Sequence, residues 1–452
     1  MKPSTKVIVV LAVVVPAIVV SVWRLMNPAP DRSIVQAASE LAQAKAEIEA
    51  LGLTLDPVEF GRRLQVPVDD DAGPIIQEVA QDIFTLGGFS ELFSGEDHVA
   101  KCVEFDRLHP EVLEELRLAA SKSGCDFQRD WSLGLNIMFP EFASMKSLVK
   151  YCSHLAEADA LEKQYDSALE KLLIADRIAS FSDADRTVIG HLVTIAGKII
   201  IESAIVRILM EESGDPAVQD LVREYVVRAA QLNQLDSCLE GELIMASTSV
   251  KEFSETYEQL FSDDQRILNS LTFGKNETRH DERTLKSIRS VERRVLADAS
   301  LAVYLRYLGE LYGHISRDAS WDETMADVAA FEASLDEAAS PSDLFMQIVR
   351  SEMSILMAAH GRSVAMLEML ALVADVLDRT RGIGLAAAVK EHDSTVYDRI
   401  NGGYFRVIMA DPGFKVYSIG IDAIDAGGTD SIGRDSFHNE SRDDFGYWIP
   451  YD

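Results

Sequence analysis

The chain of 452 residues is poor in basic residues, with 43 lysines and arginines against 74 aspartates and glutamates and a net charge of −31. A protein that binds nucleic acid through a basic face needs clustered lysines and arginines to neutralise phosphates. The composition excludes that class, so we expect no nucleic-acid partner. Because 47% of the residues are hydrophobic, we expect a folded chain, and its length predicts two or three units at about 150 residues per domain.

The sequence also lacks the short motifs that mark common enzymes. It contains no H-E-x-x-H, no G-x-S-x-G, no phosphate-binding Gly-Lys-Ser/Thr loop and no dinucleotide fingerprint. The nine histidines are scattered, and His154 and His191 lie in apolar segments where a buried structural role is expected. We therefore predict a protein that is not an enzyme, with no catalytic residue and no organic cofactor.

Cysteine is scarce, and its spacing fits no metal motif. Cys102 and Cys125 flank a predicted helix that starts near Pro110, and they could form a disulfide or remain buried thiols. Cys152 shares an apolar helix face and is expected in the core. The fourth cysteine is Cys238.

An uncharged stretch of seventeen residues, 7–23, lies between Lys6 and Arg24. At about 1.5 Å per residue it spans roughly 25 Å, the lower limit for a membrane helix. The following "SVWRLMNPAPDRS" is a poor processing site, so we expect an uncleaved anchor over 1–25 rather than a cleaved signal. Lys2 and Lys6 favour a cytoplasmic N-terminus. The expected location is the inner membrane, crossed once, with the bulk of the chain outside the cytoplasm.

The next segment, 26–74, is predicted to be a juxtamembrane helix followed by a linker. Ile34, Leu41 and Ile48 recur at seven-residue spacing, which indicates a weak stripe for self-association. The run from Asp69 to Asp71 lacks the spacing of a calcium loop and is expected to be a solvated helix entry.

Residues 75–390 show a helical pattern with few strand signals. The clearest unit, 148–181, contains two amphipathic helices that meet at Lys163 and Gln164. Small residues stand where the helices approach, at Ala156, Ala168 and Ala175, and this arrangement resembles a tetratricopeptide repeat. A helical-repeat solenoid and a helical bundle both remain open for the whole region.

The helical pattern stops near Thr395, and residues 391–452 are predicted to form a small β-rich tail. "GGYFRVIMA" and "FKVYSIGI" are typical of short strands around a turn at 411–413. The rest is dense in aspartate and glycine. Carboxylates on an irregular, glycine-rich backbone suit Ca²⁺, which takes six to eight oxygen ligands. A metal-free loop held by its own side-chain turns is the alternative.

The segment "YSIGIDAIDAGG…DDFGYW" resembles the C-terminal calcium loop of the major pseudopilin of type II secretion. The residues that match are Ser418, Gly420, Asp422, Gly427 and Gly428, with Asp444, Phe445 and Trp448 approximating the closing part. The resemblance implies a calcium site with Asp422 and Asp444 as side-chain ligands, carbonyls near Ser418 and Gly420, and Asp443, Asp430 and Asp425 as further candidates. It covers some 35 residues, and the N-terminus lacks the prepilin cleavage motif.

The layout of an N-terminal anchor, a tetratricopeptide-like middle and a "YSIG-D…GG" tail is similar to uncharacterised membrane-anchored protein families of planctomycete-type bacteria. Those families imply no reaction. We therefore predict a membrane-anchored, non-catalytic interaction or scaffold protein with an unknown protein partner and a calcium-stabilised tail. A subunit of a type II secretion or envelope assembly is one alternative, and an enzyme with a cleft in the helical region is another.

Overall fold

The computed structural model describes residues 34–83, 86, 89–229, 235–260, 293–316, 321–336, 344–420, 425 and 444–451. The described chain is mainly helical and carries a small β part at its C-terminal end, so the predicted fold class is confirmed at that level. The anchor predicted over 1–25 lies outside the described residues.

The first half of the chain is built of helices and short connections. In chain order they are α2 (Ile34–Ala50), α3 (Pro57–Leu64), α4 (Gly73–Asp82), α5 (His98–Leu108), α6 (Pro110–Ala120), the 3-10 helix η3 (Trp131–Asn136), α7 (Glu141–Leu161), α8 (Tyr165–Phe181), the 3-10 helix η4 (Ser182–Asp185), α9 (Val188–Glu212), α10 (Pro216–Arg228) and α11 (Ser237–Leu260).

The second half contains the longest helix and the strands. It consists of α14 (Arg293–Ile315), α15 (Trp321–Asp336), α16 (Leu344–Ile383), α17 (Leu385–His392), β1 (Tyr397–Asp398), β2 (Gly403–Tyr404), β3 (Arg406–Met409), β4 (Phe414–Ser418) and β5 (Phe445–Ile449).

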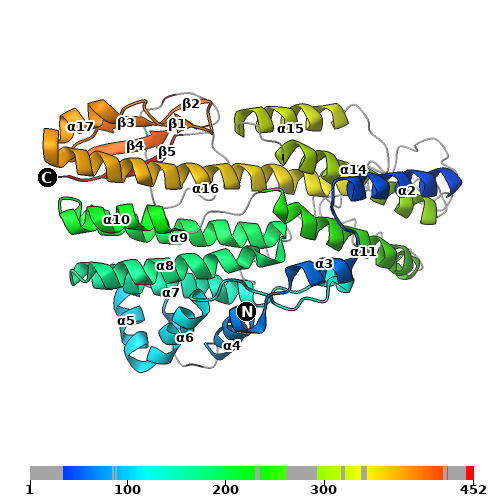
Figure 1. Ribbon diagram of the computed structural model, residues 1–452, viewed down its shortest axis with the longest axis horizontal. Helices are drawn as coiled ribbons and strands as arrows, with labels where there is room; N and C mark the ends of the chain where they lie inside the picture. The colour runs from blue at the N-terminus through cyan, green and yellow to red at the C-terminus, as the bar shows by residue number, and fades with distance from the viewer. Residues whose placement is uncertain are drawn as a thin grey trace, which may run out of the picture.

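The molecule is elongated, and most of its helices run along the long axis (Figure 1). The two largest hydrophobic cores lie end to end. The first is formed by α4 to α10, the C-terminal half of α16 and the sheet, and the second by α2, α11, α14, α15 and the middle of α16. At about 1.5 Å per residue, the 40 residues of α16 extend for roughly 60 Å. This one helix therefore belongs to both cores.

The predicted helix pair at 148–181 is present as α7 and α8, which pack against each other around the expected turn. Lys163 in that turn adopts a left-handed conformation with φ 62°, and Ala156 and Ala168 are fully buried at the contact. However, α9 packs on both α7 and α8, and α16, from far later in the chain, packs on α9 and α10. In a solenoid each repeat contacts only its neighbours, so these contacts favour a bundle closed by a distant helix.

The close approach of α8 and α9 depends on Gly197. A Cβ atom built there would lie 2.6 Å from Cβ of Ala179. Gly197→Ala is therefore expected to lower the free energy of unfolding by about 1–3 kcal/mol, because the helices must separate. Urea unfolding followed by circular dichroism measures this loss. Gly214→Ala is the control, since an added Cβ there meets nothing within 4 Å, and equal losses in the two variants would contradict the prediction.

The stripe that predicted self-association is covered within the chain. Ile48 is buried against α14, where a Cβ at Gly309 would lie 2.8 Å from its Cδ1, and Leu41 is partly buried in the same core. The self-association prediction is therefore wrong for Ile48 and Leu41. The seven-residue spacing of these apolar residues reflects the packing of α2 on α14.

The expectation of a solvated helix entry at Asp69 to Asp71 is wrong for the last residue. Asp69 and Asp70 are exposed, but Asp71 is buried, and its Oδ1 accepts hydrogen bonds from the backbone N–H groups of Gly73 and Asp126 at 2.8 Å each. The carboxylate joins the start of α4 to the loop before η3.

The tail forms an antiparallel sheet in the order β3-β4-β5, beside a β1-β2 hairpin. Val416 pairs with Val407 on one side and with Tyr447 on the other. The predicted turn at 411–413 is present between β3 and β4. Alternate residues such as Phe414, Val416 and Tyr447 belong to the first core, so the sheet packs on α16 and β5 also contacts α9 (Figure 1).

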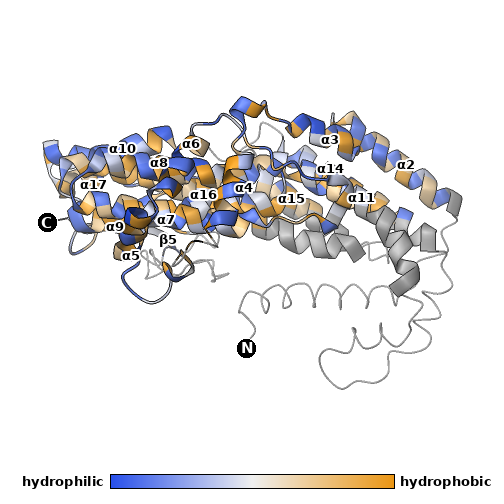
Figure 2. Cartoon of the chain, turned by 90° about the horizontal axis from the view of Figure 1, so that it is seen from below, coloured by the Kyte–Doolittle hydropathy of each residue, from blue (hydrophilic) through white to orange (hydrophobic). Residues whose placement is uncertain are grey.

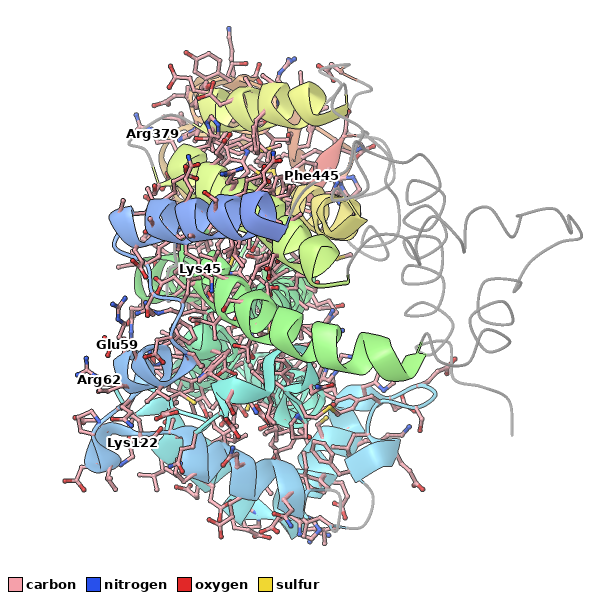
Figure 3. All side chains as sticks on the ribbon, turned by 90° about the vertical axis from the view of Figure 1, so that its right-hand side faces the viewer. Lys45, Glu59, Arg62, Lys122, Arg379 and Phe445 are labelled. Atoms are coloured by element: carbon pink, nitrogen blue, oxygen red, sulfur yellow. The ribbon has the colours of Figure 1, made fainter. Side chains whose placement is uncertain are left out.

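The helices carry both hydrophilic and hydrophobic residues along their lengths, as α2, α8 and α10 show in Figure 2. Within the described residues, one helical segment, Leu356–Ile383, is long and apolar enough to cross a membrane. It lies in the middle of the chain and packs between α9, α10 and the sheet, as expected of a core helix. Charged side chains such as those of Arg62 and Lys122 extend from the outside of the body (Figure 3).

All four cysteines are buried and free, so the structure has no Cys102–Cys125 disulfide. Burial raises the pKa of the Cys102 thiol to about 12 and raises that of Cys125 further. Cys152 lies in the first core, as predicted. These thiols have the character of small core residues rather than reactive groups.

Candidate functional site

A row of ionisable side chains runs along the buried face of α9. His191, Lys198 and Glu202 are seven and then four residues apart, so they lie on one side of the helix. The helix around them is apolar, as in "VTIAGKIIIES". All three side chains are buried, with 0%, 4% and 1% exposure. We call this set the α9 polar row.

Lys198 forms a buried ion pair with Asp176 of α8. Its Nζ lies 2.5 Å from Oδ1 of Asp176, which is 2% exposed. The hydroxyl of Tyr225 on α10 donates a hydrogen bond to the same oxygen at 3.2 Å. Three helices thus meet at one carboxylate, in the interior of the first core.

Glu202 lies one helical turn beyond Lys198, beneath the sheet. The Tyr447 hydroxyl of β5 is hydrogen bonded to its Oε2 at 3.4 Å. The pKa of Glu202 is raised to about 8, chiefly by burial; Asp176 adds to the rise, whereas Lys198 and the hydrogen bond from Tyr447 oppose it. The side chain is therefore mostly a neutral acid at neutral pH, which suits a site without water.

His191 is the middle member of a chain of three side chains. Its Nδ1 donates to Oδ2 of Asp183 at 2.9 Å, and its Nε2 lies 2.9 Å from Nδ1 of His360 on α16. The Trp321 ring stacks on His360 with centroids 5.5 Å apart. Burial and the neighbouring His191 lower the pKa of His360 to about 3, so this ring is neutral.

Arg129 forms a second buried ionic cluster near the start of α7. It pairs with Glu141 and, at 3.0 Å, with Asp185. Its guanidinium lies over the rings of Phe127 and Phe139 at 4.9 and 4.8 Å. Burial raises the pKa of Asp185 to about 6. This cluster fixes the loop before α7 against η4 and is structural in character.

The prediction that His191 is a structural core residue agrees with its full burial and its two ring partners. His154 is part-buried and pairs with Glu157. Asp176, Lys198 and Glu202 were not predicted from the sequence. A lysine and a glutamate within an apolar run were a usable signal, because a charge placed in a core must be paired or neutralised.

The candidate calcium site lies at the end of β4 and β5, at the outer edge of the sheet. Ser418 pairs with Phe445, and Asp444 comes one residue earlier with a side chain that is 0% exposed. Extending the register by one pair places Asp444 on the Tyr417 side of the sheet, opposite the Ser418 side chain. The Ser418 hydroxyl accepts a hydrogen bond from the Gly420 N–H at 3.1 Å, so the side chain of Ser418 is engaged within its own turn.

Asp425 is engaged elsewhere on the same face. Its Oδ2 pairs with Arg406 at 2.7 Å, and its Oδ1 accepts from the Tyr417 hydroxyl at 3.0 Å. A carboxylate held by a cation and a phenol is a poor additional ligand. Asp422, Asp430 and Asp443 lie outside the described residues.

Oxygen ligands suit a hard cation such as Ca²⁺, and Asp444 is the one buried carboxylate of the predicted set among the described residues at this strand end. Among the residues described, no three histidine, cysteine, aspartate or glutamate side chains are grouped to hold a metal. A calcium site here therefore depends on Asp422 and its neighbours as well as on Asp444.

Comparison with known proteins found no matching protein family, no matching curated protein and no matching solved structure. A helical fold is compatible with many activities, so the function of the chain depends on its sites rather than on its fold.

Proposed function

We propose that the protein is a membrane-anchored, non-catalytic interaction protein whose helical body presents a binding surface to a protein partner. The observation that carries this proposal is the burial of the groups best suited to catalysis. These groups form two buried sets, one of Asp176, Lys198 and Glu202 and the other of Asp183 and His191. Each of the five residues is at most 4% exposed. A substrate cannot reach them without opening the core, so a structural role accounts for them.

The shape of the body supports the same proposal. The two cores share α16 and form a long body with extensive helical sides (Figure 1). Such a body offers a large surface for association, whereas the proposed segment 7–23 would hold it at the inner membrane with its bulk outside the cytoplasm.

The test is crosslinking of the full-length chain in intact membranes, followed by identification of the crosslinked proteins. We expect the chain to sediment with the membrane and to be recovered with one reproducible protein partner. A variant with Val13 and Val14 changed to lysine is expected to leave the membrane fraction, because charges at the centre of a span are costly. Recovery of uncrosslinked monomers alone would contradict the proposed function.

The same experiment addresses the alternative, a subunit of a type II secretion or envelope assembly. That alternative depends on the resemblance of the tail between Tyr417 and Trp448 to the pseudopilin loop. Secretion components among the crosslinked proteins would favour it over a free-standing scaffold.

The enzyme alternative has one supporting observation. His360 is only part-buried and ends the Asp183–His191–His360 chain, in which a carboxylate orients one imidazole against another. Its low pKa makes it a weak base, which argues against general-base catalysis at neutral pH.

We further propose that Ca²⁺ stabilises the tail, bound by Asp422 and Asp444 with carbonyls of Ser418 and Gly420, and with Asp443, Asp430 and Asp425 as lesser candidates. Millimolar Ca²⁺ is expected to raise the melting temperature of the full-length protein, because a ligand that binds only the folded state stabilises it. The double variant with Asp422→Ala and Asp444→Ala is expected to lose this response.

Asp425→Ala is the matched control, since its carboxylate is held by Arg406 and Tyr417, and it is expected to keep most of the response. Differential scanning fluorimetry with and without chelator measures the shift. The calcium proposal fails if the wild-type melting temperature does not change, or if the double variant responds as the wild type does.

A further inference from the structure

We infer that Lys198 and Asp176 form an intramolecular amide bond that joins α9 to α8, with Glu202 as the proton shuttle. The two side chains already meet end to end, with Nζ of Lys198 2.5 Å from Oδ1 of Asp176. Both are in the first core, at 4% and 2% exposure. A covalent bond between two side chains of one chain can form only where the reacting atoms are held in contact and water does not compete for them.

The bond forms from the neutral forms of both groups. A core solvates an ammonium and a carboxylate less well than water does, so the proton transfer that makes both groups neutral costs less there than in water. In the neutral form one proton has moved from Nζ to the carboxyl group, which leaves a free amine beside a carboxylic acid. The amine is the nucleophile, and the acid is a far better electrophile than its anion.

Glu202 and Tyr225 are placed to assist. Glu202 is four residues after Lys198 on the same face of α9, and it interacts electrostatically with both Lys198 and Asp176. Its pKa of about 8 means that it holds a proton at neutral pH. The Tyr225 hydroxyl donates to Oδ1 of Asp176 at 3.2 Å, where negative charge develops when the amine adds.

The reaction balances without an oxidant or a co-reactant. Nζ adds to Cγ of Asp176, whose Oδ2 carries the proton that came from Nζ, and a new N–C bond forms while Tyr225 hydrogen bonds Oδ1. Glu202 gives its proton to Oδ2 and takes one from the nitrogen, so the Cγ–Oδ2 bond breaks and one water leaves. Oδ1 remains as the amide carbonyl oxygen, and Glu202 ends as it began.

The chain offers a matched comparison in Lys171 and Asp159, which also form a close ion pair between α8 and α7. Their side chains are more exposed, at 11% and 16%, than those of Lys198 and Asp176, at 5% and 3%. The short contact is thus shared by both pairs. Of these two pairs, the Lys198–Asp176 pair is the more deeply buried, and it has the protonated Glu202 beside it. We therefore expect an amide bond in that pair and none between Lys171 and Asp159.

Mass spectrometry of the full-length protein, purified and denatured, tests the inference. We expect a mass lower than that of the unlinked chain by one water molecule. Tryptic digestion should yield a branched species that joins the peptide containing Asp176 to the peptide containing Lys198, because trypsin does not cleave after an acylated lysine. Peptides containing Lys171 and Asp159 should appear unlinked.

Lys198→Arg keeps a cation beside Asp176 without a nucleophilic amine, so this variant should show no loss of water. Glu202→Gln keeps the shape of the side chain without the transferable proton, and the linked fraction should fall by at least tenfold. Should either variant fail to fold, the wild-type digest decides alone. Unlinked peptides at both Asp176 and Lys198 in the wild type, or full linkage in Glu202→Gln, would overturn the inference.

Discussion

Replacing Lys198 with methionine is expected to lower the free energy of unfolding by about 3–5 kcal/mol, the range measured when one partner of a buried pair is removed. The substitution leaves the carboxylate of Asp176, 2% exposed, without the ammonium that faces it. The Tyr225 hydroxyl remains as a hydrogen-bond donor, but it carries no charge. If the amide has formed, the same substitution removes a covalent link between α8 and α9, so the direction of the effect is unchanged.

Urea unfolding of the full-length protein, followed by far-ultraviolet circular dichroism, measures the loss. Lys171→Met is the control, because Asp159 is more exposed and water can solvate it once its partner is removed. We expect a clearly smaller loss in that variant. Equal losses would mean that burial of the Lys198–Asp176 pair does not increase the cost of removing one partner.

The second large effect is a dependence of stability on pH that originates in Glu202. The pKa of its carboxyl is about 8 in the folded chain, against an ordinary value of 4.5. Between these values the folded state holds a proton that the unfolded state has released. Stability therefore falls as pH rises from about 5 to 8, by up to about 1.4 kcal/mol per pH unit, and the contribution of Glu202 is fully lost above that range.

Glu202→Gln removes this contribution while keeping the shape of the side chain. Its free energy of unfolding should fall less steeply between pH 5 and 8 than that of the wild type. Asp185, whose pKa is raised to about 6, adds a similar decline at lower pH in both proteins, so the difference between the two curves isolates Glu202. Parallel curves would show that Glu202 is not held as a neutral acid.

Local features of the fold were predictable from the sequence because their causes are local. The turn between α7 and α8 at Lys163 and Gln164 follows from two amphipathic periods with polar residues between them. The turn between β3 and β4 follows from Asp-Pro-Gly between two alternating segments. In both places the residues that determine the structure lie within a few positions of one another.

The α9 polar row could not be assigned its partners from the sequence. Glu202 meets Tyr447 across 245 positions, and His191 meets His360 across 169. No periodicity within one segment contains such pairings. The sequence of α9 could only have indicated that Lys198 and Glu202 needed partners, because an apolar helix face does not otherwise accept them.

The environments of the aspartates in the tail could not be predicted from the sequence either. The resemblance to the pseudopilin loop ranked Asp444 above Asp425 as a ligand, but nothing in the irregular, glycine-rich segment indicated how either carboxylate is held. The structure distinguishes them. Asp425 is held in an ion pair with Arg406, whereas the register of β4 and β5 places Asp444 buried at the strand end.

Because α16 supplies side chains to both cores, the two ends of the body are expected to unfold as one cooperative unit. Opening either end disturbs the helix on which the other end packs. In native-state hydrogen exchange, backbone amides of α14 near one end and of β4 near the other should then share a common opening free energy under mild denaturant. A ligand bound at the tail would slow exchange at the far end of the molecule, although it touches nothing there.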